Sequence, residues 1–164
     1  DALTWAQDHV AILSGLYGVL RPLDRMQPYR LEMGTKLPTP RGRSLYAFWK
    51  DSIAPHLNGL LDGHADGTFV NLASKEYFGA VDKKALAHRV IDFTFQDVKD
   101  GKARTISFYA KHARGAMARW MIDHRLDHAE ALKEAAPDGY RYDANASTET
   151  TWVYRRPQPP PKNG

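Results

Sequence analysis

Apolar side chains recur at helical spacing in three parts of the chain and predict a helix in each. The first predicted helix covers Trp5–Tyr17. The second covers Leu45–Leu61, where Ser44 is a suitable N-cap and Pro55 predicts a kink or a break. The third, over residues 109–126, has apolar residues on one arc and basic residues on the opposite arc, so one side is expected to pack and the other to face solvent.

Shorter apolar or alternating runs predict strands between these helices. Thr68–Ser74 is expected to be a buried strand that leads into a helical turn over Lys75–Ala80. Arg89–Gln96 and Arg104–Tyr109 are expected to pair antiparallel, because Asp100-Gly101 between them is a strong hairpin turn signal. This mixture of elements predicts the α/β class, with a mixed sheet and surrounding helices.

The C-terminal part continues with shorter elements. A short helix is expected over Asp127–Ala136, followed by two edge strands over Tyr140–Tyr142 and Thr150–Tyr154. The last segment, 155–164, is rich in proline and is predicted to be a disordered tail. No repeat is evident, so we predict a single domain over residues 1–154.

The segment 14–37 is predicted to be a structured loop that presents basic side chains. Pro22 and Pro28 remove backbone donors and disfavour helix at the residues before them. The glycine spacing of this segment matches neither a P-loop nor a dinucleotide-binding fingerprint. The basic residues of the loop are Arg21, Arg25, Arg30 and Lys36.

Basic residues are concentrated in two blocks, although the net charge of the chain is only +4. Residues 17–43 hold six Lys or Arg against two acids, and residues 104–125 hold five against one. The second block places Lys111, Arg114 and Arg119 on the outer arc of the predicted helix. Two interpretations stay open: a solvated surface whose charges pair with acids from 82–100, or a shared anionic partner, which we favour.

The junction between the predicted strand and the helical turn places several polar groups close together. Ser74 is expected to cap the turn, while Lys75 and Glu76 are candidates for a site, since ligands often bind at strand ends of α/β sheets. If the protein is an enzyme, Glu76 would be the acid or base, Lys75 and Lys111 would supply positive charge, and Arg114 would hold a phosphate. The sequence leaves the question of catalysis open.

Composition excludes several kinds of chemistry. The chain has no cysteine, which excludes disulfides, thiolate metal sites and cysteine nucleophiles. His124 and His128 have chelating spacing, but exposed pairs of this kind are more often solvated, so no metal and no cofactor are predicted. No apolar run of membrane-spanning length and no leader are evident, which favours a cytoplasmic protein without membrane contact.

Four runs of the sequence carry a resemblance to a known family. They are SGLYGVLRPLDRMQPYRLEMGTKL (14–37), LYAFWKDSI (45–53), NLASKEYF (71–78) and ISFYAKHARGAMARWMI (106–122). In this order they resemble the YaaA family of bacterial peroxide-stress proteins. The family motif includes Lys75 and Glu76.

The resemblance implies a single-domain α/β fold, called the cantaloupe fold, with a positively charged cleft that binds duplex DNA. It also implies a role in lowering free iron during peroxide stress. Family members begin upstream with a short strand and a helix-hairpin-helix segment, so the N-terminal part is expected to be missing here. The leading prediction is DNA binding through phosphates with little base readout. The alternatives are a glycosidase-type or lyase-type enzyme acting on a nucleotide or base, and a basic surface that binds another protein.

Overall fold

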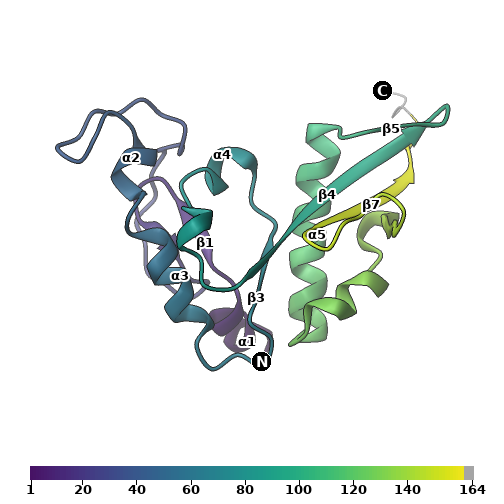
Figure 1. Ribbon diagram of the computed structural model, residues 1–164, viewed down its shortest axis with the longest axis horizontal. Coiled ribbons are helices and arrows are strands. Elements are labelled where there is room, and N and C mark those ends of the chain that lie inside the picture. The colour runs from purple at the N-terminus through teal and green to yellow at the C-terminus, as the bar shows by residue number, and fades with distance from the viewer. Residues whose placement is uncertain (161–164) are drawn as a thin grey trace. The chain divides into compact units, whose positions relative to one another are not determined.

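The computed structural model describes residues 1–160, and their contacts group the chain into two compact units (Figure 1). Unit 1 comprises residues 1–67 and 73–89. Unit 2 comprises residues 68–72 and the chain from Val90 onward. Among the helices of residues 1–160, none is both long enough and apolar enough to cross a membrane. The prediction of one domain over residues 1–154 stays a prediction.

Unit 1 consists of short helices, a two-stranded antiparallel sheet and a long loop. In the sheet, Ile12 lies opposite Leu20. The indole N–H of Trp49 donates a hydrogen bond to the carbonyl of Gly15 at 2.9 Å, which joins the second helix to the hairpin. The elements are α1 (Ala2–His9), β1 (Ile12–Ser14), β2 (Gly18–Leu20), α2 (Leu45–Trp49), α3 (Ile53–Leu61), α4 (Lys75–Phe78) and the 3-10 turn η1 (Lys83–Ala85).

The helix predicted over Trp5–Tyr17 is wrong beyond His9. The backbone turns extended at Val10, and the chain then forms the β1–β2 hairpin. Two local features favour the hairpin: the Ser14 hydroxyl accepts a hydrogen bond from the backbone N–H of Tyr17 at 3.0 Å, and Gly18 has a φ of 76°, which glycine adopts without strain.

The helix starts predicted from serine residues are confirmed. The Ser44 hydroxyl accepts from the Ala47 N–H at 3.2 Å, and the Ser74 hydroxyl accepts from the Tyr77 N–H at 3.3 Å. The predicted break in the second helix is also present, between α2 and α3. Pro55 lies just after the break, in the first turn of α3, where a missing backbone donor costs little.

Unit 2 is built on a mixed sheet, which confirms the predicted α/β class. The strand order is β3-β4-β7-β6, and β5 pairs with β4. The helix α5 lies against the strands (Figure 1), and its Ala113 and Met117 share a buried cluster with Phe95, Trp152 and Tyr154. The elements are β3 (Thr68–Asn71), β4 (Arg89–Lys99), β5 (Lys102–Arg104), α5 (Ser107–His124), β6 (Arg141–Tyr142), β7 (Thr151–Pro157) and the 3-10 helices η2 (Ala129–Glu134) and η3 (Pro137–Gly139).

The hairpin between β4 and β5 is confirmed, but β5 begins earlier than predicted, at Lys102, and shares only Arg104 with the strand predicted over 104–109. Asp100 and Gly101 have φ values of 50° and 73°, as a tight hairpin turn requires. The strand predicted over 104–109 ends at Arg104, because α5 already begins at Ser107. The helical spacing of the residues that follow outweighs the strand preference of Phe108.

Two predictions at the C-terminal end are corrected by β7. Thr150–Tyr154 was expected to form an edge strand, yet β7 lies between β4 and β6 and runs parallel to β4. The predicted tail over 155–164 is wrong for residues 155–157, which belong to β7. Residues 158–160 form no helix or strand, and residues 161–164 lie outside the described part of the chain.

Candidate phosphate-binding surfaces

The basic loop of unit 1, residues 21–37, is joined to α4 by a hydrogen bond. The carboxylate of Glu76 accepts a hydrogen bond from the backbone N–H of Gly34 at 2.9 Å. The hydroxyl of Tyr46 donates to the backbone carbonyl of Glu76, also at 2.9 Å, and the Met33 side chain is fully buried. The structure therefore brings Lys75 and Glu76 together with the loop that holds Lys36.

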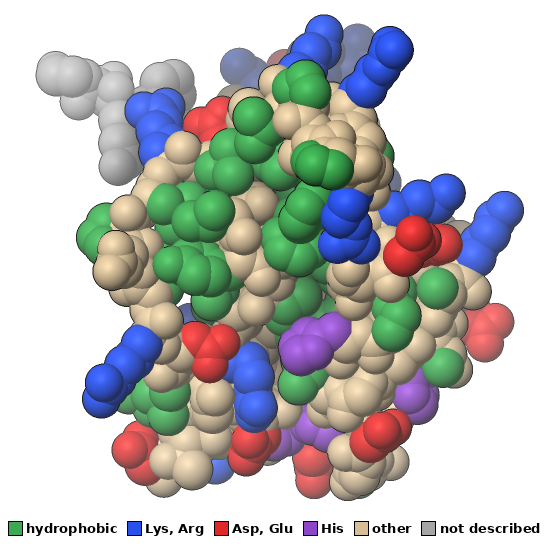
Figure 2. Space-filling model, turned by 90° about the vertical axis from the view of Figure 1, so that its left-hand side faces the viewer, with side chains coloured by type: hydrophobic (Ala, Val, Ile, Leu, Met, Phe, Trp, Pro, Cys, Tyr) green, Lys and Arg blue, Asp and Glu red, His purple; other side chains and the backbone are tan. Residues whose placement is uncertain are grey.

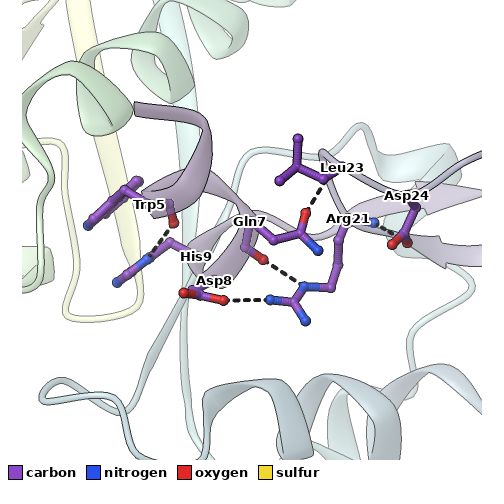
Figure 3. A network of polar contacts seen from close by, with 7 residues as sticks. All are labelled: Trp5, Gln7, Asp8, His9, Arg21, Leu23 and Asp24. Carbon is purple, nitrogen blue, oxygen red and sulfur yellow. Dashed lines mark hydrogen bonds and ion pairs between the residues drawn. The ribbon is translucent and has the colours of Figure 1, made fainter. Parts of the chain in front are cut away.

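The side chain of Arg21 reaches back to the end of α1 (Figure 3). Its Nε donates to the backbone carbonyl of Gln7 at 2.6 Å, and its Nη2 donates to the carboxylate of Asp8 at 2.8 Å. The Arg21 N–H donates to Asp24, and the Leu23 N–H donates to the Gln7 side chain, at 2.8 and 2.7 Å. Arg21 thus fixes the start of the loop against the end of α1, and much of its hydrogen-bonding capacity is used there.

Several basic residues of unit 1 have no acidic partner within residues 1–160. Arg25, Lys36 and Lys75 are exposed and make no ion pair with any residue in the described range 1–160. Arg30 lies 3.6 Å from Glu32, but both side chains are largely solvated, so the pair is weak. These side chains keep most of their positive charge available to a ligand.

The environment of Tyr77 favours the neutral form of its hydroxyl. Burial raises the pKa of Tyr77, and the carboxylate of Glu76 and the nearby Tyr29 and Glu32 raise it further. The phenol therefore adds no negative charge beside the basic loop at neutral pH.

Replacing Glu76 by alanine is expected to release the loop from α4. Loss of one hydrogen bond to a charged acceptor should lower the free energy of unfolding by about 1–2 kcal/mol. It should also increase the hydrogen-exchange rate of the Gly34 amide, whose acceptor is removed. Glu76→Gln retains an oxygen acceptor and is the control. If the Gly34 amide exchanged at the same rate in Glu76→Ala and in the unmodified chain, the hydrogen bond to Glu76 would not be what holds the loop to α4.

The second group of basic residues lies on α5 in unit 2. Lys111 and Arg119 are exposed, Arg114 is half-buried, and Ala113 and Met117 on the other side of the helix are buried, which confirms the predicted arcs. Arg119 pairs with Asp123 at 2.8 Å, whereas Lys111 makes no ion pair within residues 1–160. We expected the basic residues of α5 and those of the loop of unit 1 to line one groove, and this stays a prediction.

His124 at the end of α5 and His128 in the following turn contact residues close to them in the sequence. The His124 ring nitrogen Nδ1 lies 2.9 Å from the Trp120 carbonyl, and the two rings stack with centroids 4.0 Å apart. His128 lies 3.8 Å from the carboxylate of Asp127. Within residues 1–160, no group of three or more His, Asp or Glu is arranged to hold a metal ion.

Sequence reasoning missed a buried charged cluster in unit 2. The Arg156 Nε donates to the fully buried carboxylate of Asp97 at 2.7 Å, and the Tyr140 hydroxyl donates to the second oxygen of that carboxylate at 2.7 Å. The Arg156 guanidinium also lies over the rings of Tyr140 and Tyr109, at 4.2 and 5.0 Å. Burial, followed by the hydrogen bond to Asp97, raises the pKa of Tyr140. The signal that could have revealed this cluster is the pair Arg155 and Arg156, which directly follows the aromatic segment that ends at Tyr154.

Comparison with known proteins decides the family. The sequence model described as "Peroxide stress protein YaaA" matches residues 1–146. The chain belongs to the YaaA family. The match confirms the resemblance seen in the four sequence runs.

Three relatives of this YaaA-family chain are UPF0246 proteins. Those from Caulobacter vibrioides (strain NA1000), Phenylobacterium zucineum and Azoarcus sp. (strain BH72) are 59%, 57% and 57% identical to it. The alignments cover 96%, 98% and 96% of the chain, and 62%, 60% and 62% of the relatives. The chain therefore spans less than two thirds of the length of these relatives.

Proposed function

We propose that this YaaA-family chain belongs to a cytoplasmic protein that binds DNA during peroxide stress and helps to limit damage by free iron. Ferrous iron reacts with peroxide, and the products damage DNA close to the place where they form. A protein that covers the phosphate backbone would act where this damage occurs. The family membership supports the role in peroxide stress, and the distribution of charge supports the contact with DNA.

The observation that carries the proposal is the set of basic side chains without acidic partners. Arg25, Lys36 and Lys75 in unit 1 and Lys111 in unit 2 make no ion pair within residues 1–160. A side chain that is not neutralised inside the protein can replace a cation condensed on DNA, and release of that cation drives binding. The acids of 82–100 do not pair with any of these four residues, which favours an external anion.

The contribution of α5 can be tested by removing two charges from it. The double variant Lys111→Gln/Arg114→Gln is expected to weaken binding of a 20-base-pair duplex and to reduce the slope of log K against log salt by about 1.8. Fluorescence anisotropy over a series of salt concentrations gives both quantities.

A matched control removes the same charge at another place. Lys99→Gln/Lys102→Gln changes the exposed ends of the β4–β5 hairpin and is expected to leave the salt slope nearly unchanged. Equal losses in the two double variants would show that only net charge matters and would refute a specific surface on α5. Absence of duplex binding by the unmodified chain at low salt would refute DNA binding by this chain.

A further inference from the structure

Exposed large apolar side chains are concentrated at the start of unit 1. Several belong to the hairpin and the basic loop, although apolar groups of this size are normally buried. Figure 2 shows one face of the structure, on which hydrophobic side chains lie exposed among Lys, Arg, Asp and Glu. The exposed apolar residues of the hairpin and loop are Leu16, Tyr17, Leu23, Met26, Tyr29 and Leu37.

Two of these residues, Tyr17 and Tyr29, form a contacting aromatic pair. Their rings meet edge to face, with centroids 5.6 Å apart and an interplanar angle of 73°. Each residue is 37% exposed. In an edge-to-face pair, the ring that presents its edge keeps both of its faces free of the other ring, so a planar ligand can stack on the pair.

Hydrogen bonds fix both rings before any ligand binds. The Tyr17 hydroxyl accepts from the backbone N–H of Gln27 at 3.2 Å. The Tyr29 hydroxyl is hydrogen-bonded to the hydroxyl of Ser14, which is buried and also accepts from the Tyr17 N–H. Because these hydrogen bonds hold the hydroxyl ends, the rings are oriented before binding, and little conformational entropy is lost when a ligand stacks on them.

Two basic residues, Arg25 and Arg30, lie close to the tyrosines in the sequence. Arg25 lies between the two tyrosines in the sequence and makes no ion pair within residues 1–160. Arg30 directly follows Tyr29 and has only the weak contact with Glu32. A ligand that suits this loop has a planar apolar part beside a negative charge. A nucleotide with an unpaired base has both, whereas in a duplex the faces of each base are covered by its neighbours.

We propose that the Tyr17–Tyr29 pair stacks on an unpaired base of single-stranded DNA whose phosphates contact Arg25 and Arg30. This inference rests on the proposed DNA binding and adds the kind of DNA that the loop of unit 1 recognises. An anionic membrane would also attract a basic and apolar loop. The rigid aromatic pair favours the base, since insertion into lipid requires no fixed ring orientation.

The test compares oligonucleotides with equal charge and different bases. Binding of a 12-nucleotide dT strand is measured by anisotropy beside a strand of 12 abasic residues and a 12-base-pair duplex, at about 0.2 M salt, where phosphate contacts are weakened. The dT strand is expected to bind at least about tenfold more tightly than the abasic strand. The variant Tyr17→Leu/Tyr29→Leu should reduce this ratio to about two or less, with a smaller loss of duplex binding.

A second measurement does not depend on how the double variant folds. A strand with one 2-aminopurine should show a change in base fluorescence on binding to the unmodified chain and to Tyr29→Phe, which keeps the ring. Equal affinity for the dT and abasic strands, with no fluorescence change, would overturn the inference. If the duplex still bound in that case, the proposed function would stand. Absence of binding to all three nucleic acids at low salt as well would overturn both. Tyrosine-dependent binding to phosphatidylglycerol vesicles, without preference for dT over abasic DNA, would overturn it in favour of a membrane.

Discussion

Replacing Asp97 by alanine is expected to lower the free energy of unfolding by about 3–5 kcal/mol, because it leaves the Arg156 charge without its carboxylate. The Asp97 side chain is fully buried and that of Arg156 is only 14% exposed, so water cannot readily take the place of the missing partner. The Tyr140 hydroxyl loses its acceptor in the same substitution. Urea unfolding followed by tryptophan fluorescence measures the change.

A neighbouring ion pair on the same strand provides the control for Asp97. Arg155 donates to Asp143 at 3.0 Å, with side chains 36% and 27% exposed. Asp143→Ala is therefore expected to cost less than about half as much as Asp97→Ala, since solvent screens the arginine that remains. If both substitutions had the same effect, burial would not be the source of the stability, and the interpretation of the cluster would be wrong.

The second large effect is expected from Gly15→Ala in the β1–β2 hairpin. A Cβ atom at residue 15 would clash with the backbone oxygen of Leu31, which cannot move aside as a flexible side chain would. Either the hairpin or the basic loop must shift, at an expected cost of about 3 kcal/mol. Thermal unfolding should show a lower midpoint, and the shifted loop should reduce DNA affinity.

Another glycine of unit 1 serves as the control for Gly15. Gly59 lies inside α3, and a Cβ atom there would meet nothing within 4 Å. Gly59→Ala is expected to raise the stability by about 0.5–1 kcal/mol, because alanine loses less backbone entropy in a helix. A Gly15→Ala variant with an unchanged midpoint would show that the loop does not pack closely on the hairpin.

The sequence predicted those parts of the fold that local chemistry controls. Ser44 and Ser74 cap helices because their hydroxyls reach backbone N–H groups three residues ahead. Asp100 and Gly101 form a turn because both accept a positive φ. In each case the residues that decide the conformation are adjacent in the chain.

The errors arise where contacts between distant residues decide the structure. The apolar spacing of Val10, Leu13 and Leu16 fits a helix, but the chain forms a hairpin that packs with Trp49, 34 residues beyond Gly15. The central position of β7 depends on pairing with β4, whose residues are 59 positions earlier. No pattern within a short window contains this information.

The sequence names the candidate basic residues but not the contacts that each of them makes within the chain. The sequence identified Arg21 as a ligand candidate, yet its guanidinium contacts Gln7 and Asp8, two residues that no motif connects with it. Glu76 was considered as an acid or base, and its carboxylate holds the Gly34 amide. Both residues show that a charged side chain proposed for a ligand also positions a loop.

The parallel pairing of β7 with β4 sets an order of events during protein synthesis. The hairpin from β4 to β5 can form as soon as its residues leave the ribosome, whereas β6 can pair only with β7. The sheet of unit 2 therefore stays incomplete until translation has passed Pro157 and that residue has emerged. Until then, one edge of β4 and the aromatic residues beside it are open to chaperones, and a ribosome that stalls before this point would hold a nascent chain prone to aggregation.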